Sequence, residues 1–104
     1  MFKFLKNIFS NNNDDLKKIV NEGAFLVDVR SQGEYISGHV KGSTNIPLDQ
    51  IKNQMAKFKG KNNIVVFCRS GMRSSQAKSI LENNGFSNVI NGGTWNKIDK
   101  LLNH

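Results

Sequence analysis

The sequence contains few residues that bind soft metals or form cross-links: one cysteine, Cys68, and two histidines, His39 and His104, among 104 residues. A single cysteine excludes an internal disulfide, and these scattered side chains lack the clustered Cys/His pattern of a zinc site. We therefore expect no metal. A lone thiol is typical of a reducing compartment, which predicts a cytoplasmic location.

Long apolar runs are also missing. The nearest candidate is the N-terminal segment MFKFLKNIF, but Lys3 and Lys6 interrupt it, and asparagines follow where a signal peptide carries small residues. We expect residues 1–13 to form a short amphipathic extension and residues 14–102 to form one domain, with no integral membrane segment.

Acidic residues are outnumbered, since 15 basic and 8 acidic side chains give a net charge of +7. The lysines are spread along the chain, whereas a nucleic-acid-binding surface is typically a clustered basic stripe with interleaved aromatic residues. The charge therefore predicts a general attraction for small anions and no nucleic-acid partner.

Short apolar runs alternate with amphipathic segments along the chain. This alternation predicts an α/β fold with a mainly parallel sheet, and the segment 63–67, with its continuous β-branched and aromatic core, is typical of a strand that is covered on both faces. Ser31 and Glu34 have the spacing of a helix capping box. We expect strands at 25–29, 44–46, 63–67 and 88–90, a turn at 92–93, and helices at 13–23, 31–36, 48–58, 74–84 and 95–102.

The segment after the 63–67 strand carries the chemistry. Cys68 lies at the carboxyl end of that strand, the edge at which open parallel sheets bind ligands. Gly71 permits a tight turn whose amides can form an anion-binding nest ahead of the next helix. The strand alone would indicate an inert buried cysteine. The loop, with Arg69 and Arg73, instead favours a reactive thiolate.

The loop Cys68–Ser74, CRSGMRS, resembles the active-site loop of rhodanese-type sulfurtransferases of the single-domain kind. The resemblance covers about residues 14–102, and together its blocks are specific to that family. The other matching blocks, in order, are Leu26–Arg30, Glu34–Tyr35, Gly38–Pro47, Gly85–Phe86 and Val89–Gly93.

The resemblance implies a single rhodanese-like α/β domain, with a central, mainly parallel sheet of about five strands and helices on both faces. It also implies that Cys68 is the catalytic nucleophile, which takes a sulfane sulfur from a small anionic donor such as thiosulfate. The sulfur passes to cyanide or a thiol from a persulfide on Cys68, with no other cofactor. The substrate-binding residues implied by the resemblance are Arg69, Ser70, Gly71, Met72 and Arg73.

The remaining blocks are interpreted as architecture. Asp28 and Arg30 are expected to fix the turn after the first strand by side-chain hydrogen bonds. His39 is expected to make a buried, structural hydrogen bond. Trp95 departs from the family pattern, because it follows Gly93 by only two residues, and the last helix is therefore expected to start or rotate differently.

Two other functions stay open. Related folds with a cysteine–arginine loop act as phosphatases or arsenate reductases, but they place five residues between the cysteine and the arginine. This chain has four, from Arg69 to Met72, which gives a smaller cradle suited to one sulfur atom. The domain could alternatively serve as a sulfur-relay or binding module for a partner protein.

Overall fold

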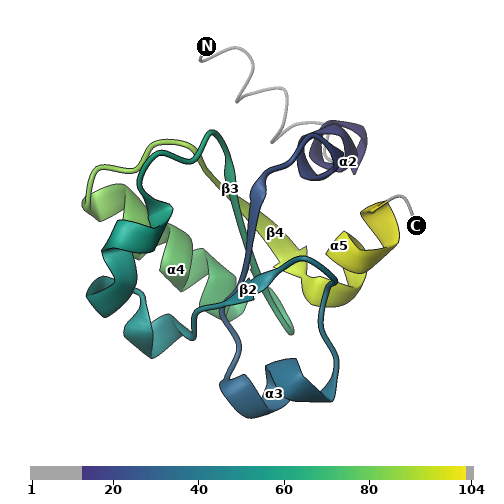
Figure 1. Ribbon diagram of the computed structural model, residues 1–104, viewed down its shortest axis with the longest axis horizontal. Helices are drawn as coiled ribbons and strands as arrows, with labels where there is room; N and C mark the ends of the chain where they lie inside the picture. Colours follow the sequence, from purple (N-terminus) through teal and green to yellow (C-terminus); the bar gives the residue numbers. More distant parts are fainter. Residues whose placement is uncertain (1–12, 103–104) are drawn as a thin grey trace.

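Four parallel strands form the centre of the computed structural model, which describes residues 13–102 (Figure 1). They lie in the order β2 (Thr44–Asn45), β1 (Phe25–Asp28), β3 (Ile64–Cys68) and β4 (Val89–Thr94). About five strands were expected, and four are present within the described residues. The expected extension at residues 1–13 lies outside them, apart from Asn13, the first residue of the first described helix.

Helices cover both faces of this sheet, as expected. Helices α2 (Asn13–Asn21) and α5 (Trp95–Leu101) lie on one face (Figure 1). Helix α4 (Met72–Asn83) and the 3₁₀ segments η1 (Leu48–Gln50) and η2 (Lys52–Phe58) lie on the other. The short helix α3 (Gln32–Ser37) follows β1. None of the described helices is long and apolar enough to cross a membrane.

Strand β3 is the most deeply buried element, with no residue exposed to solvent. Successive side chains of a strand point to opposite faces of the sheet. Val65 and Phe67 therefore pack toward α2 and α5, whereas Val66 and Cys68 pack toward α4 and the 3₁₀ segments. This alternation places the sulfur of Cys68 on the face that α4 covers.

The segment 48–58, predicted as one helix, is instead formed by η1 and η2, with a kink at Gln54 (φ −121°). A 3₁₀ helix has 3.0 residues per turn. The steps from Leu48 to Ile51 and from Met55 to Phe58 are three residues long and fit that repeat. Only the four-residue step between Ile51 and Met55 suggested an α-helix, and that step spans the kink.

The paired glycines at 92–93, predicted as a turn, belong to β4. Val66 pairs with Asn91 and Phe67 pairs with Gly93, so Gly92 is the extra residue of a β-bulge. The strand runs directly into α5, whose first turn is capped by the Thr94 hydroxyl, which accepts a hydrogen bond from the Lys97 amide. The early position of the tryptophan therefore reflects a helix that begins at once after the strand.

Gly92 has no room for a side chain. A Cβ atom there would lie 2.9 Å from Val65 Cγ1 and 2.9 Å from Ile98 Cδ1. We predict that Gly92→Ala lowers the free energy of unfolding by about 1 to 3 kcal/mol, the usual cost of overpacking a core. The matched control is Gly33→Ala, where a Cβ meets nothing within 4 Å. Urea denaturation should show a loss in the first variant only; equal stabilities would contradict the packing argument.

Candidate active site

Cys68 is the last residue of β3 and is fully buried. The chain then turns through Arg69 and Ser70 to Gly71, the N-cap of α4, which adopts the left-handed conformation (φ 97°). The helix begins at Met72, two residues earlier than predicted, because Gly71 can take a conformation that other residues avoid. Arg73 consequently lies in the first turn of α4.

The Cys68 sulfur contacts polar groups of the loop and of the first turn of α4. The Gly71 amide donates a hydrogen bond to Sγ at 2.9 Å, and the Ser74 hydroxyl lies 3.6 Å from it. Both come from the N-terminal end of α4, where free backbone N–H groups and the helix dipole favour negative charge. The sulfur therefore lies in the expected nest at the helix terminus.

These contacts favour the thiolate. Burial by itself raises the pKa of the Cys68 thiol and is the largest single influence on it. Hydrogen bonds from the Ser74 hydroxyl, and then from the amides of Ser74, Gly71 and Ser70, act in the opposite direction. Together they outweigh burial, and the pKa lies below its ordinary value.

The two arginines of the loop contribute less than the sequence suggested. Arg69 is exposed, and Arg73 donates two hydrogen bonds to Glu34, with Nη1–Oε1 at 2.7 Å and Nη2–Oε2 at 3.0 Å. The hydrogen bonds with Glu34 are the main cause that raises the pKa of Arg73; the negative charge of Cys68 is a smaller one. The Cys68 thiolate is therefore stabilised more by hydrogen bonds than by the charge of the arginines.

Glu34 is a functional neighbour that sequence reasoning did not place at the site. The sequence predicted Glu34 as the capping-box partner of Ser31 and as part of the matching block Glu34–Tyr35, and the structure confirms the capping box. Its second role, the bidentate pair with Arg73, joins residues 39 positions apart. The hydrogen bond from Arg73 and then the amide of Ser31 lower the pKa of Glu34 from 4.5 to about 2.

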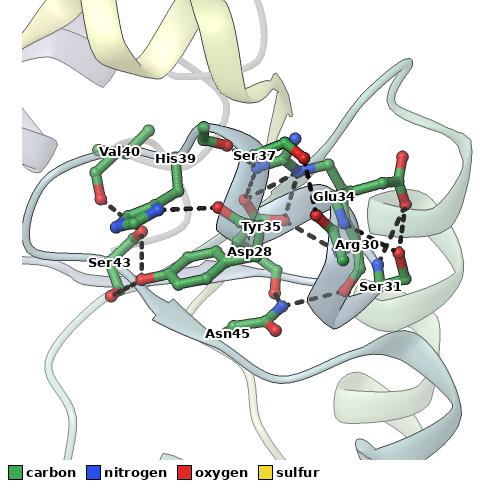
Figure 2. A network of polar contacts seen from close by, with 12 residues as sticks. Asp28, Arg30, Ser31, Glu34, Tyr35, Ser37, His39, Val40, Ser43 and Asn45 are labelled. Carbon is green, nitrogen blue, oxygen red and sulfur yellow. Dashed lines mark hydrogen bonds and ion pairs between the residues drawn. The ribbon is translucent and has the colours of Figure 1, made fainter.

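A second polar network ties the end of β1 to the loop before β2 (Figure 2). Buried Asp28 accepts hydrogen bonds from the Arg30 amide and guanidinium, and Arg30 Nη2 also donates to the Gly38 carbonyl at 2.6 Å. Trp95 covers Arg30, with the guanidinium carbon 4.7 Å from the ring centre. The side-chain hydrogen bonds expected of Asp28 and Arg30 are therefore present.

His39 differs in part from its expectation. It makes a local hydrogen bond, from Nδ1 to the Tyr35 carbonyl at 2.8 Å (Figure 2), but its side chain is exposed. Its ring stacks on Tyr35 with centroids 3.9 Å apart, and the Tyr35 hydroxyl donates to the Ser43 carbonyl. Its hydrogen bond is structural, as predicted, while the predicted burial is wrong.

An open pocket of about 530 Å³ lies beside the loop, where α4 faces η1. Arg73 is the member of the Cys68 loop that lines it, and Cys68 itself does not. The pocket is therefore adjacent to the sulfur site without containing it. Its other lining residues are Val29, Ser31, Pro47, Leu48, Asp49, Lys52 and Ile80.

Comparison with known proteins agrees with this architecture. The Rhodanese-like domain family matches residues 12–96, and the chain belongs to that family. It is 42% identical over 69 residues to the thiosulfate sulfurtransferase PspE of Escherichia coli, covering 64% of this chain and 66% of PspE. It is 32% identical over 71 residues to the putative sulfur carrier protein YrkF of Bacillus subtilis, covering 68% of this chain and 38% of YrkF.

Solved structures give the same fold. The human single-domain sulfurtransferase TSTD1 superposes with a TM-score of 0.68 at 25% identity, covering 84% of this chain and 91% of that protein. The chain thus spans less than two thirds of either curated relative but most of this single-domain structure. Its relatives include sulfurtransferases, and a rhodanese-like single domain is the common unit.

The Glu34–Arg73 pair should make stability depend on pH. Because folding lowers the pKa of Glu34, its contribution is complete above about pH 4.5 and is lost as the pH falls toward about 2. Glu34→Gln keeps the capping geometry but removes the charge, so it should cost about 0.5 to 1 kcal/mol at pH 7, as for a partly exposed pair. Urea denaturation of both proteins should show this difference shrinking through that window.

Glu22→Gln, at an exposed carboxylate just after α2, is the matched control and should behave as the wild type at each pH. A difference for Glu34→Gln that stays constant from pH 7 to pH 2 would contradict the ion pair as its source.

Gly71 should be needed for more than chain geometry. Gly71 and Gly23 have nearly the same left-handed φ, 97° and 98°. Substitution of either by alanine should therefore cost a similar amount, about 1 to 2 kcal/mol. Only Gly71→Ala should also raise the pKa of Cys68, because it displaces the amide that donates to Sγ. The pH dependence of iodoacetamide alkylation measures this; equal pKa values in the two variants would show that the amide does not stabilise the anion.

Proposed function

We propose that this domain is a sulfurtransferase that carries a sulfane sulfur as a persulfide on Cys68. The observation that carries the proposal is the buried sulfur at the head of α4, with the Gly71 amide 2.9 Å away and the Ser74 hydroxyl beside it. A buried anion needs donors in place of water, and this loop supplies them. The relationship to PspE, named as a thiosulfate sulfurtransferase, supports the same reaction.

In the first half-reaction the Cys68 thiolate attacks the outer sulfur of thiosulfate. A bond forms between the two sulfurs, the sulfur–sulfur bond of thiosulfate breaks, and sulfite leaves with the bonding electron pair. This is nucleophilic catalysis by a thiol whose pKa is lowered, and it does not require a neighbouring general base. The product on the protein is a persulfide anion.

In the second half-reaction an acceptor, cyanide or a thiolate, attacks the terminal sulfur. The Cys68 sulfur leaves as a thiolate, which the Gly71 amide and the Ser74 hydroxyl stabilise as they did before the reaction. The same contacts thus serve the attacking and the leaving form of the sulfur. The reaction needs no metal or organic cofactor in this scheme.

The other loop residues have different proposed roles in substrate binding. The amides of Ser70 and Gly71 point to the sulfur and are suited to an incoming anion. Arg73 is held beside the sulfur site by Glu34, which offsets its charge, and it is the guanidinium nearest to an incoming anion in this scheme. Arg69 and Met72 are exposed, Met72 by 73%, and are placed to meet a donor or acceptor as it arrives.

These exposed side chains also favour a second candidate, sulfur relay to a partner protein. Exposed large apolar side chains are few among residues 13–102, and Met72 is one of them. An apolar side chain at the reactive loop suits contact with another macromolecule. The relationship to YrkF, named as a putative sulfur carrier protein, also supports sulfur relay as the second candidate.

The persulfide is the testable core of the proposal. Incubation with thiosulfate should yield a protein one sulfur atom heavier by intact mass spectrometry, and cyanide should remove that sulfur as thiocyanate. Cys68→Ser should give neither product. The matched control is Ser75→Ala, at an exposed position of α4 one residue beyond Ser74, which should keep both. A Cys68→Ser protein that still gains sulfur, or a wild type that does not, would refute the proposal.

The same proteins separate the alternatives. Relay would appear as slow transfer to cyanide and small thiols but rapid transfer to a protein thiol, seen as loss of the added sulfur from the mass spectrum. Hydrolysis of an aryl phosphate by the wild type and not by Cys68→Ser would instead indicate the phosphatase that the four-residue loop disfavours.

A further inference from the structure

Asn91, on β4, joins the sulfur site through Ser74. The Ser74 side chain is fully buried, and its hydroxyl oxygen lies 2.7 Å from Asn91 Oδ1, 3.0 Å from the Gly71 carbonyl and 3.6 Å from Cys68 Sγ. Neither the sequence pattern nor the family resemblance gave Asn91 a role. It approaches the sulfur from the neighbouring strand and not from the loop.

The orientation of the Asn91 amide follows from its backbone partner. Asn91 Oδ1 lies 2.9 Å from the Gly93 amide, which can only donate a hydrogen bond. The atom that faces Gly93 must therefore be the oxygen. Because the Ser74 hydroxyl meets the same oxygen, Ser74 must be the donor in that contact.

The Ser74 hydroxyl has one hydrogen and three groups around it. The Gly71 carbonyl lies farther from the Ser74 oxygen than Asn91 Oδ1 does, at 3.0 Å against 2.7 Å, and it also accepts the Ser75 amide at 3.1 Å, so it is the weaker competitor for that hydrogen. When Cys68 is a thiol, Ser74 donates to Asn91 and accepts from the thiol. When Cys68 is a thiolate, a lone pair of Ser74 would face a negative sulfur, and the hydroxyl must turn to donate to Sγ.

We propose that Asn91 is a positioning residue that competes with Cys68 for the single Ser74 hydrogen. This competition limits how strongly the Ser74 hydroxyl stabilises the Cys68 thiolate. This deepens the proposed function, since the same sulfur is its nucleophile. Intrinsic nucleophilicity falls as a thiol becomes more acidic, and attack is best when the thiol ionises near the ambient pH. An acceptor at Asn91 keeps the sulfur from being stabilised so strongly that it loses reactivity.

The test measures ionisation of Cys68 from the pH dependence of iodoacetamide alkylation, with no sulfur donor. Asn91→Ala removes the competitor, so the ratio of thiolate to thiol at a fixed pH should rise about three- to tenfold, the effect of one ordinary hydrogen bond. Ser74→Ala should lower the ratio. In the Ser74→Ala protein, adding Asn91→Ala should change nothing, because there is no hydrogen to compete for.

A merely structural role gives a different result. If Asn91 only braces the loop, Asn91→Ala should loosen the amides around the sulfur and leave the thiolate ratio unchanged or lower it, with or without Ser74. Either outcome overturns the proposal. Other charged groups near the sulfur stay in place in these variants: Arg73 on α4, Glu34 on α3, and Asp28 with Arg30 after β1.

A second variant covers the case in which Asn91→Ala does not fold. Asn91→Asp keeps the acceptor for the Gly93 amide and strengthens it for Ser74, so it should lower the thiolate ratio, and by more in the wild-type background than with Ser74→Ala. Equal effects in the two backgrounds would refute competition for the hydrogen. Because alkylation requires no sulfur transfer, the Asn91 proposal can fail while persulfide formation succeeds, and the reverse.

Discussion

The structure of the site depends on one constraint: an ionisable sulfur is held at the buried end of β3, where water does not solvate it. A charge in such a place needs protein donors, since burial alone pushes the thiol toward its neutral form. The donors come from the first turn of α4, and they reach Sγ only because the chain reverses within three residues. Gly71 makes that reversal possible.

The rest of the domain fixes the two elements that meet at this point. Strand alternation turns Cys68 toward the face that α4 covers. Helix α4 is held to that face by Ala77 and Leu81, which are fully buried against the sheet. The Arg73–Glu34 pair joins the first turn of α4 to α3. Rigid elements on both sides thus define where the loop amides lie.

The sequence was sufficient for the features whose causes are local. The mostly β-branched run within 63–67 predicted strand β3, and Gly71 predicted the tight turn that follows Cys68, since each follows from neighbouring residues. The capping box at Ser31 was found for the same reason. Four of the strands expected along the chain are present, in a parallel sheet.

Features that depend on partners distant in sequence were missed or misjudged. Glu34 and Arg73, or Ser74 and Asn91, are brought together only by the fold, and no periodicity relates them. The strength assigned to arginine charge was too large, because Arg73 is neutralised by a partner that the loop sequence does not contain. The segment 48–58 was wrongly predicted as one helix because its apolar residues recur at both three-residue and four-residue spacings. Only the packing of the folded chain decides between those two repeats.

The bulge in β4 shows how the second strand beside Cys68 also serves the site. The register between β3 and β4 shifts at Gly92, between the pairs Val66–Asn91 and Phe67–Gly93, one residue before the pair that contains Cys68. The shift brings the Gly93 amide back onto the Asn91 side chain, which fixes the carbonyl oxygen that meets Ser74. Successive side chains of a regular strand point to opposite faces, and the bulge interrupts that alternation between Asn91 and Gly93. Gly92 and Gly93 were predicted as a simple turn. They instead form the bulge that fixes the Asn91 side chain against the Ser74 hydroxyl, next to the Cys68 sulfur.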